Sequence, residues 1–232
     1  MEPDGGQTRK QREDGLRTRK SILREAVSLA TVEGLEGLSI GDLAKALDMS
    51  KSGLYAHFGS KQDLQLATID EAERIFDLEV IEPAAAVQDE GLPQLLAICD
   101  NFFEHLRRRT FPGGCFFASA VLEMGTRPGP VKERIGLFQQ RFAGLILQFA
   151  QRAQELGQIA SDEDPTLLAF DLNGIILAAN ANFVMTQNAG ALDVARRAVR
   201  RRLGLNTDPK LEAAPEAPKQ RSSADRRRRS NR

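Results

Sequence analysis

Apolar residues recur every three to four positions along most of the chain, and this spacing predicts helices rather than strands. In residues 16–33, for example, Ile22, Ala26 and Ala30 fall on one face, and Gly34 ends the segment. There is no sustained alternation of apolar and polar residues, and no Asn-Gly or Asp-Gly pair joins two β-branched runs. The pattern therefore predicts an all-α fold.

The bounds of the predicted helices follow from this periodicity and from the residues that open and close each segment. Ser39 and Ser50 stand in N-cap positions, and Ser60 forms a capping pair with Asp63. The helix that begins there is expected to end before Pro83. The expected helices span residues 16–33, 40–47, 51–57, 61–81, 92–108, 116–124, 129–156, 165–187 and 191–203.

Composition divides the chain into four parts. Residues 1–15 are polar and contain glycine, which predicts a flexible N-terminal arm. Residues 16–65 hold the short helices of a small domain, and residues 66–205 hold the long helices of a larger one. Residues 206–232 lack apolar periodicity and contain a run of four arginines, which predicts a disordered basic tail. Such a tail either keeps the chain soluble or binds nucleic acid without sequence preference.

The 32 basic and 32 acidic residues cancel, which excludes a histone-like protein that binds nucleic acid through bulk charge. The charges are nevertheless segregated: residues 66–190 carry 9 basic and 17 acidic groups, and residues 191–232 carry 13 basic and 5 acidic groups. The N-terminus lacks the layout of a signal peptide, and no uninterrupted apolar run approaches the roughly 18 residues of a membrane span. We therefore expect a soluble, cytoplasmic protein with no membrane partner.

Residues 38–64 have the pattern of a helix-turn-helix unit. Leu43, Leu54 and Phe58 can meet in a small core, and residues 48–50 form a short turn between two helices. In such a unit the second helix enters the major groove of DNA.

The second helix of this unit supplies most of the candidate DNA contacts. Lys51, Tyr55 and His57 point away from the small core and are natural partners for phosphate, whereas Ser52 and Gly53 are small enough to approach base edges. The basic start of the first helix adds further contacts. The residues predicted to bind a double-stranded DNA operator are Arg17, Lys20, Ser39, Lys51, Ser52, Gly53, Tyr55, His57 and Lys61.

In residues 54–61, Leu-Tyr-Ala-His-Phe-Gly-Ser-Lys, and in the helices on either side, the chain resembles the TetR family of one-component transcriptional regulators. The family more often places Gly in the turn where this chain has Asp48, but Asp tolerates a left-handed backbone better than most residues. The resemblance implies a homodimeric repressor that leaves a palindromic operator when a small effector binds and moves the fourth helix. The alternative is a helical protein that binds a small ligand or a partner without sequence-specific DNA binding.

In that family the effector binds among the middle helices of the larger domain. The chain has twelve phenylalanines and no tryptophan, which suits an apolar pocket with a few polar anchors. Apolar side chains at helical spacing are, however, more often plain core. We expect a small hydrophobic or aromatic effector, and the candidate effector-binding residues are Asn101, Phe102, His105, Cys115, Phe116, Glu123, Phe138, Phe142 and Asn173.

Cys115 follows two glycines at the expected start of a helix and has two interpretations. Near a helix N-terminus its thiolate is favoured, which would make it reactive toward oxidants or electrophiles. Alternatively, it is a small core residue. Cys99 lies on the apolar face of a helix and is interpreted as core. A disulfide between the two is not expected in a reducing cytoplasm.

The last two predicted helices have the character of a dimerisation surface. Residues 172–183 mix small and aliphatic side chains, which lets helix backbones approach closely, and the next helix carries an apolar stripe with arginines beside it. The alternative is that both helices only close the core of one protomer. TetR-like proteins use these helices in an intersubunit four-helix bundle, which implies a dimer interface at Ile175, Ala179, Phe183, Leu192, Ala195 and Val199.

An enzyme is not expected. The two histidines occur in no metal-binding or Cys-His spacing, and the chain has no Gly-x-Ser-x-Gly sequence and no phosphate-binding loop. Two isolated cysteines cannot build a four-ligand zinc site. Neither a metal nor a cofactor is therefore predicted.

Overall fold

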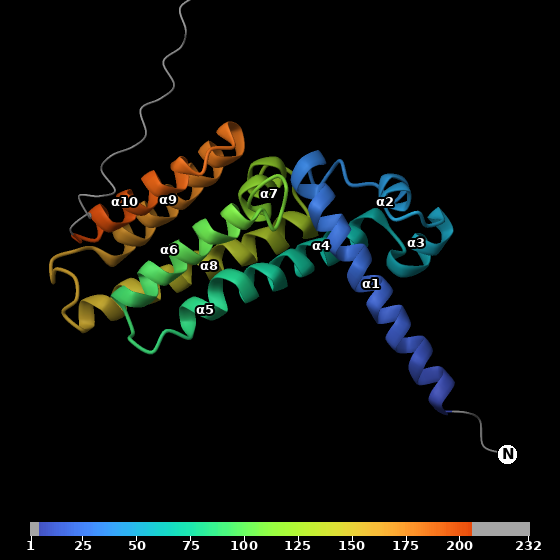
Figure 1. Cartoon of the computed structure of the whole chain (residues 1–232), viewed down its shortest axis with the longest axis horizontal. Coiled ribbons are helices and arrows are strands. Elements are labelled where there is room, and N and C mark those ends of the chain that lie inside the picture. Colours follow the sequence, from blue (N-terminus) through green and yellow to red (C-terminus); the bar gives the residue numbers. More distant parts are fainter. Residues whose placement is uncertain (1–4, 206–232) are drawn as a thin grey trace, which may run out of the picture.

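The computed structural model describes residues 5–205, and every regular element in that range is a helix, which confirms the all-α prediction (Figure 1). The predicted tail at residues 206–232 lies outside the described residues. In chain order the elements are α1 (Gly5–Glu33), α2 (Ile40–Ala46), α3 (Lys51–Phe58), α4 (Lys61–Phe76), the π-helix η1 (Asp77–Ile81), α5 (Glu82–Ala85), α6 (Leu92–Arg108), α7 (Phe116–Met124), α8 (Pro130–Glu155), α9 (Pro165–Thr186) and α10 (Gly190–Arg202).

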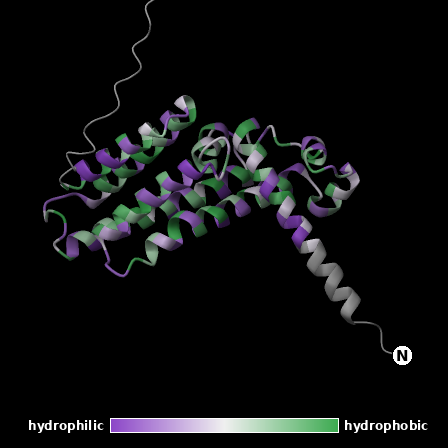
Figure 2. Cartoon of the chain, in the orientation of Figure 1, coloured by the Kyte–Doolittle hydropathy of each residue, from purple (hydrophilic) through white to green (hydrophobic). Residues whose placement is uncertain are grey.

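The helices form two parts that share one apolar core. The short helices α2 and α3 lie at one end of the molecule, while α6, α8, α9 and α10 run together as a bundle at the other (Figure 1). Helix α4 belongs to both parts, because it packs against α1 and α3 and also against α8. The long helices carry apolar and polar stripes (Figure 2), and the buried apolar residues of both parts form a single cluster.

Helix α1 begins well before the expected position. It runs from Gly5, so residues 5–15 belong to the helix and the predicted start at residue 16 is wrong. The segment between Gln7 and Asp14 is rich in Gln, Lys, Arg and Glu, which are good helix formers. Because the following turns are anchored by buried residues, the helix extends toward the N-terminus without a new nucleation step.

Pro83 does not end the long helix that starts at Lys61. A π-helical turn, η1, intervenes, in which the N–H of Glu82 donates to the carbonyl of Asp77, five residues back. Pro83 then stands in the first turn of α5, where a missing N–H is tolerated. The widened turn therefore lets the chain continue as far as Ala85, and the predicted stop is wrong.

The expected local signals of the small domain are confirmed. The hydroxyls of Ser39, Ser50 and Ser60 accept hydrogen bonds from N–H groups three residues later, at 3.0–3.1 Å. Asp48, in the turn between α2 and α3, has a φ of 51°, the left-handed conformation that the sequence led us to expect. These features fix the orientation of α3 relative to α2.

Candidate nucleic-acid interface and effector cavity

Helix α3 is held against the small domain by two buried side chains and presents the opposite face to solvent. Leu54 and Phe58 are buried, whereas Lys51, Ser52 and Tyr55 are exposed. The predicted outward positions Gly53 and His57 are half-buried. The helix thus offers one cation, one hydroxyl and one phenol on a single exposed face.

Arg19 of α1 fixes the C-terminal end of α3. Its guanidinium lies 4.7 Å from the centre of the Phe58 ring and donates a 3.1 Å hydrogen bond to the carbonyl oxygen of His57. The predicted DNA contacts Arg17 and Lys20 are exposed on α1. The sequence suggested Arg19, like Arg17 and Lys20, as a further DNA contact, and it did not reveal that Arg19 supports α3.

Lys61 is engaged within the protein. Its Nζ donates to the carbonyl oxygen of Glu36 at 2.5 Å and to the Glu36 carboxylate at 3.1 Å. The hydrogen bond from Lys61, with a second one from Gln65, lowers the pKa of Glu36. Lys61 therefore ties the start of α4 to the segment after α1, and its predicted role as a phosphate partner competes with this contact. Ser39, another predicted DNA contact, is likewise engaged within the protein as the N-cap of α2.

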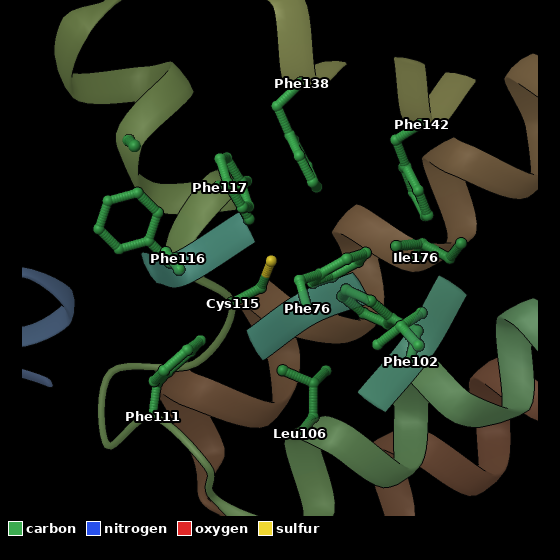
Figure 3. Packing of buried hydrophobic residues seen from close by; sticks show 14 of the residues in the cluster. Phe76, Phe102, Leu106, Phe111, Cys115, Phe116, Phe117, Phe138, Phe142 and Ile176 are labelled. Carbon is green, nitrogen blue, oxygen red and sulfur yellow. The ribbon is translucent and has the colours of Figure 1, made fainter. Parts of the chain in front are cut away.

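Several predicted effector residues surround a small cavity between α4, α6, α7, α8 and α9 (Figure 3). Its volume is about 20 Å³, room for a single water molecule. No lysine, arginine, aspartate or glutamate lines it. The lining side chains that the sequence predicted are Phe102, Cys115, Phe138, Phe142 and Asn173, and those it did not include Phe76, Phe117 and Gln139.

Aromatic rings fill the place where a larger pocket was expected. The ring of Phe117 stacks on that of Phe138 with centroids 3.4 Å apart, and Phe138 is parallel to Phe142. Phe76 meets the edges of this stack, with centroids 5.2 Å from Phe138 and 5.3 Å from Phe142 (Figure 3). The rings therefore leave little room in the cavity and would have to move before a larger group enters.

Four predicted effector residues do not line this cavity. Phe116 is buried beside Phe117, and the amide of Asn101 donates to the carbonyl of Val80 in η1 at 3.2 Å. The other two, His105 and Glu123, have partners elsewhere. Asn101, which the sequence suggested as a ligand contact, is thus bonded to the backbone of the π-helical turn instead.

His105 is buried between aromatic rings and bonded to Glu79 of η1. Its Nδ1 lies 2.7 Å from a Glu79 oxygen, which also accepts from Thr110 at 2.7 Å. Burial lowers the pKa of His105, although Glu79 opposes the shift. The ring is therefore neutral at pH 7, with the proton on Nδ1, and Nε2 is buried without a hydrogen-bond partner among the described residues.

Cys115 is a core residue. Its side chain is buried, and burial raises the pKa of the thiol to about 11, although the N–H groups of Phe117 and Ala118 partly oppose the shift. Cys99 is also buried, with a pKa raised to about 12, and both thiols are free. The interpretation of Cys115 as a favoured thiolate is therefore wrong, because loss of water outweighs the helix N-terminus.

The predicted dimer residues mostly face the inside of the protomer. Ala179, Phe183, Leu192, Ala195 and Val199 are buried within it, and Ile175 is half-buried. The exposed apolar side chains of α9 are instead Leu167, Phe170, Leu177 and Met185. By length and composition α9 is also, among the described helices, the one apolar enough to cross a membrane, although 39% of its apolar window is buried in the protein.

Ion pairs join α4 and η1 to α8 beside the cavity. Arg134 contacts Asp70 at 2.8 Å and also pairs with Glu73, while Arg141 contacts Glu73 at 2.8 Å and Asp77 at 2.5 Å. These bridges hold α4, which also packs against α1 and α3, against the wall of the cavity. Among the side chains that the structure describes, no three His, Cys, Asp or Glu residues lie together in a way that could hold a metal ion.

Two family models match the chain. The model described as "Bacterial regulatory proteins, tetR family" covers residues 22–68, and the model described as "Tetracyclin repressor-like, C-terminal domain" covers residues 91–199. Among curated proteins, the transcriptional regulator AcuR of Cereibacter sphaeroides is 24% identical over 154 residues, which represent 65% of this chain and 68% of AcuR.

Solved structures share the fold. A TetR transcriptional regulator from Chloroflexus aurantiacus J-10-FL has a TM-score of 0.76 at 23% identity, covering 83% of this chain and 96% of its own. AibR in complex with isovaleryl coenzyme A and operator DNA has a TM-score of 0.65 at 23% identity, covering 79% of this chain and 96% of its own.

Proposed function

Since the chain belongs to the TetR family of bacterial regulatory proteins, we propose that it is a repressor that binds a palindromic operator as a homodimer and releases it when a small apolar effector binds. The observation that carries this proposal is the exposed face of α3, with Lys51, Ser52 and Tyr55 pointing away from buried Leu54 and Phe58. An α-helix with such a face fits the major groove, where small side chains approach base edges and a cation meets phosphate.

Selection from random duplex DNA, followed by titration of the selected sequence, tests this proposal. We expect Tyr55→Ala and Lys51→Ala each to weaken binding of the selected duplex about tenfold or more, since each removes a groove or phosphate contact. Lys51→Ala should also lower the salt dependence of binding by about one counterion.

Lys132→Ala is the matched control, because Lys132 is an exposed lysine of α8 rather than of α3. Its affinity for the selected duplex should stay within about twofold of the wild type. Equal binding by all three variants would show that α3 does not face DNA. Selection of no sequence at all would favour a helical ligand-binding protein instead.

The effector we propose carries a short acyl or aromatic group. The cavity has only uncharged lining residues, and the carboxamides of Gln139 and Asn173 are the polar groups able to meet a carbonyl or an amide. AibR, whose structure contains isovaleryl coenzyme A, supports an acyl group as one chemical class. The ring cluster, including Phe76, would close around the apolar part of such a ligand.

The dimer we propose uses the outer face of α9. Phe170 is 75% exposed there, and Leu167, Leu177 and Met185 follow on the same helix. Exposed apolar side chains at helical spacing are typical of a helix that packs against a second copy. Two copies related by a twofold axis would present two α3 helices to the two halves of a palindrome.

Phe170→Arg is expected to raise the dissociation constant of the dimer about 100-fold, because an unpaired guanidinium would be buried between the protomers. Sedimentation equilibrium over a range of protein concentrations measures this constant. Leu137→Arg on α8, where the native leucine is 60% exposed, is the control and should leave it unchanged. An unchanged constant for Phe170→Arg would place the interface on another surface.

A further inference from the structure

Glu123 of α7 is hydrogen-bonded to the turn that follows α1. One carboxylate oxygen accepts the N–H of Leu35 and the other accepts the N–H of Glu36, both at 2.8 Å. Gly34 precedes them with a φ of 84°, and a Cβ added there would lie 2.8 Å from the Glu123 oxygen. The carboxylate therefore contacts the backbone of the turn between α1 and α2 directly. The helix that carries it, α7, lines the cavity with its first turn.

A second contact joins the same two parts through the loop before α7. The N–H of Gly113 donates to the hydroxyl of Thr31 on α1 at 3.1 Å. A Cβ added at Gly113 would lie 1.8 Å from the Thr31 carbonyl oxygen, so a larger residue cannot occupy this position without moving the backbone. The loop and α1 are thus in direct backbone contact.

The same loop is also fixed to α9. Gly114 has a φ of 88°, and a Cβ there would lie 2.6 Å from the side-chain oxygen of Asn180. That oxygen accepts the N–H of Cys115 at 2.8 Å, and Asn180 is buried. Residues 113–115, here called the glycine junction, therefore contact α1, α9 and, through Cys115, the cavity.

We propose that Glu123 and the glycine junction are positioning residues that couple the effector cavity to α1 and so to the orientation of α3. This inference rests on the proposed function, because it assigns the route by which that regulation travels. Rings that part to admit a ligand include Phe117, two residues beyond Cys115 on the first turn of α7. Displacement of that turn moves the Glu123 carboxylate, and the turn after α1 follows because both of its amides are bonded to it.

This route is distinct from the one along α4. Helix α4 is clamped to α8 by Arg134 and Arg141, whereas the contacts of Glu123 bypass α4 and reach α1 directly. If the contacts of Glu123 only stabilised the fold, their loss would change the free energy of unfolding and nothing else. If they couple the two sites, DNA binding at α3 also changes the conformation around the cavity, because linkage between two sites is reciprocal.

Alkylation of Cys115 by iodoacetamide tests the proposal on the full-length protein. Peptide mass spectrometry separates Cys115 from Cys99, and the rate is measured with and without the selected operator duplex. In the wild type, DNA should slow alkylation of Cys115 about fivefold or more, the usual size of allosteric coupling. Glu123→Ala should bring this ratio close to one.

Two further variants keep the test interpretable. Glu133→Ala removes an exposed carboxylate of α8 and should keep the wild-type ratio. Glu123→Gln retains the side-chain length and one acceptor oxygen, and it replaces Glu123→Ala if thermal unfolding shows that the alanine variant is not folded. An unchanged ratio in both Glu123 variants, with DNA still bound, would overturn the coupling while leaving the proposed function intact.

If selection yields no DNA sequence, the proposed function fails and the coupling is decided without DNA. Amide hydrogen exchange then follows Leu35 and Glu36, and iodoacetamide follows Cys115. Loss of the Glu123 carboxylate should accelerate both about tenfold relative to Glu133→Ala, since each hydrogen bond to a charged group contributes substantially to local stability. Faster exchange at Leu35 and Glu36 with unchanged alkylation of Cys115 would overturn the proposal.

Discussion

Phe76→Ala is expected to lower the free energy of unfolding by about 3–5 kcal/mol, the range for a buried phenylalanine truncated in a well-packed core. Phe76 is 2% exposed and stands against five rings, those of Phe102, His105, Phe117, Phe138 and Phe142. Its removal leaves a cavity and takes away edge-to-face contacts as well. Urea unfolding followed by circular dichroism measures the change.

Leu137→Ala is the control for Phe76→Ala, because Leu137 is a large apolar residue that is 60% exposed on α8. Its effect should stay within about 0.5 kcal/mol. Phe76→Leu, which keeps most of the volume, should fall between the two. A loss below about 1 kcal/mol in Phe76→Ala would contradict a tightly packed ring cluster around the cavity.

Gly113→Ala is expected to lower the free energy of unfolding by about 3 kcal/mol, as overpacking and a broken hydrogen bond act together. The added methyl would lie 1.8 Å from the Thr31 carbonyl oxygen, so the loop must withdraw from α1 and lose its bond to the Thr31 hydroxyl. The same urea titration reports the loss, and operator binding by the variant should weaken with it.

Gly136→Ala is a control of opposite sign. A Cβ at Gly136, inside α8, meets nothing within 4 Å, and Ala is the better helix former. This variant should gain about 0.5–1 kcal/mol. If both glycine variants were stabilised, the close approach of the 113–115 loop to α1 would be refuted.

Local chemistry explains why the small domain could be predicted closely from sequence. Serine caps at positions 39, 50 and 60 define where three helices start, and Gly59, with a φ of 68°, defines where α3 stops. Each of these signals acts within a few residues, so no knowledge of distant packing is needed. Where Pro83 was expected to end a helix, the deciding feature was a widened turn just before it, which composition does not reveal.

Long-range features could be predicted only in part. The apolar positions of α9 are visible in the sequence, but the helix is apolar on more than one side, so its pattern does not tell which side faces α8 and α10. Ala179 and Phe183 were therefore placed at the dimer interface although they are buried within the protomer.

Glu123 illustrates a second limit of sequence reasoning. It was predicted as a polar anchor for the effector because it lies in one of the middle helices, where effectors bind in the family that the chain resembles. Its partners are the backbone amides of Leu35 and Glu36, which precede it in the chain by 88 and 87 positions. Backbone N–H groups have no signature in side-chain type, so only the folded arrangement reveals them.

The tight packing of the aromatic rings around Phe138 also sets a kinetic expectation for ligand entry. A cavity of about 20 Å³ admits no acyl or aryl group. The protein must therefore first adopt a rare conformation in which the rings are parted. The apparent dissociation constant is then raised by the inverse of that state's population. At high effector concentration the observed association rate would level off at the rate of ring opening rather than rise with each collision.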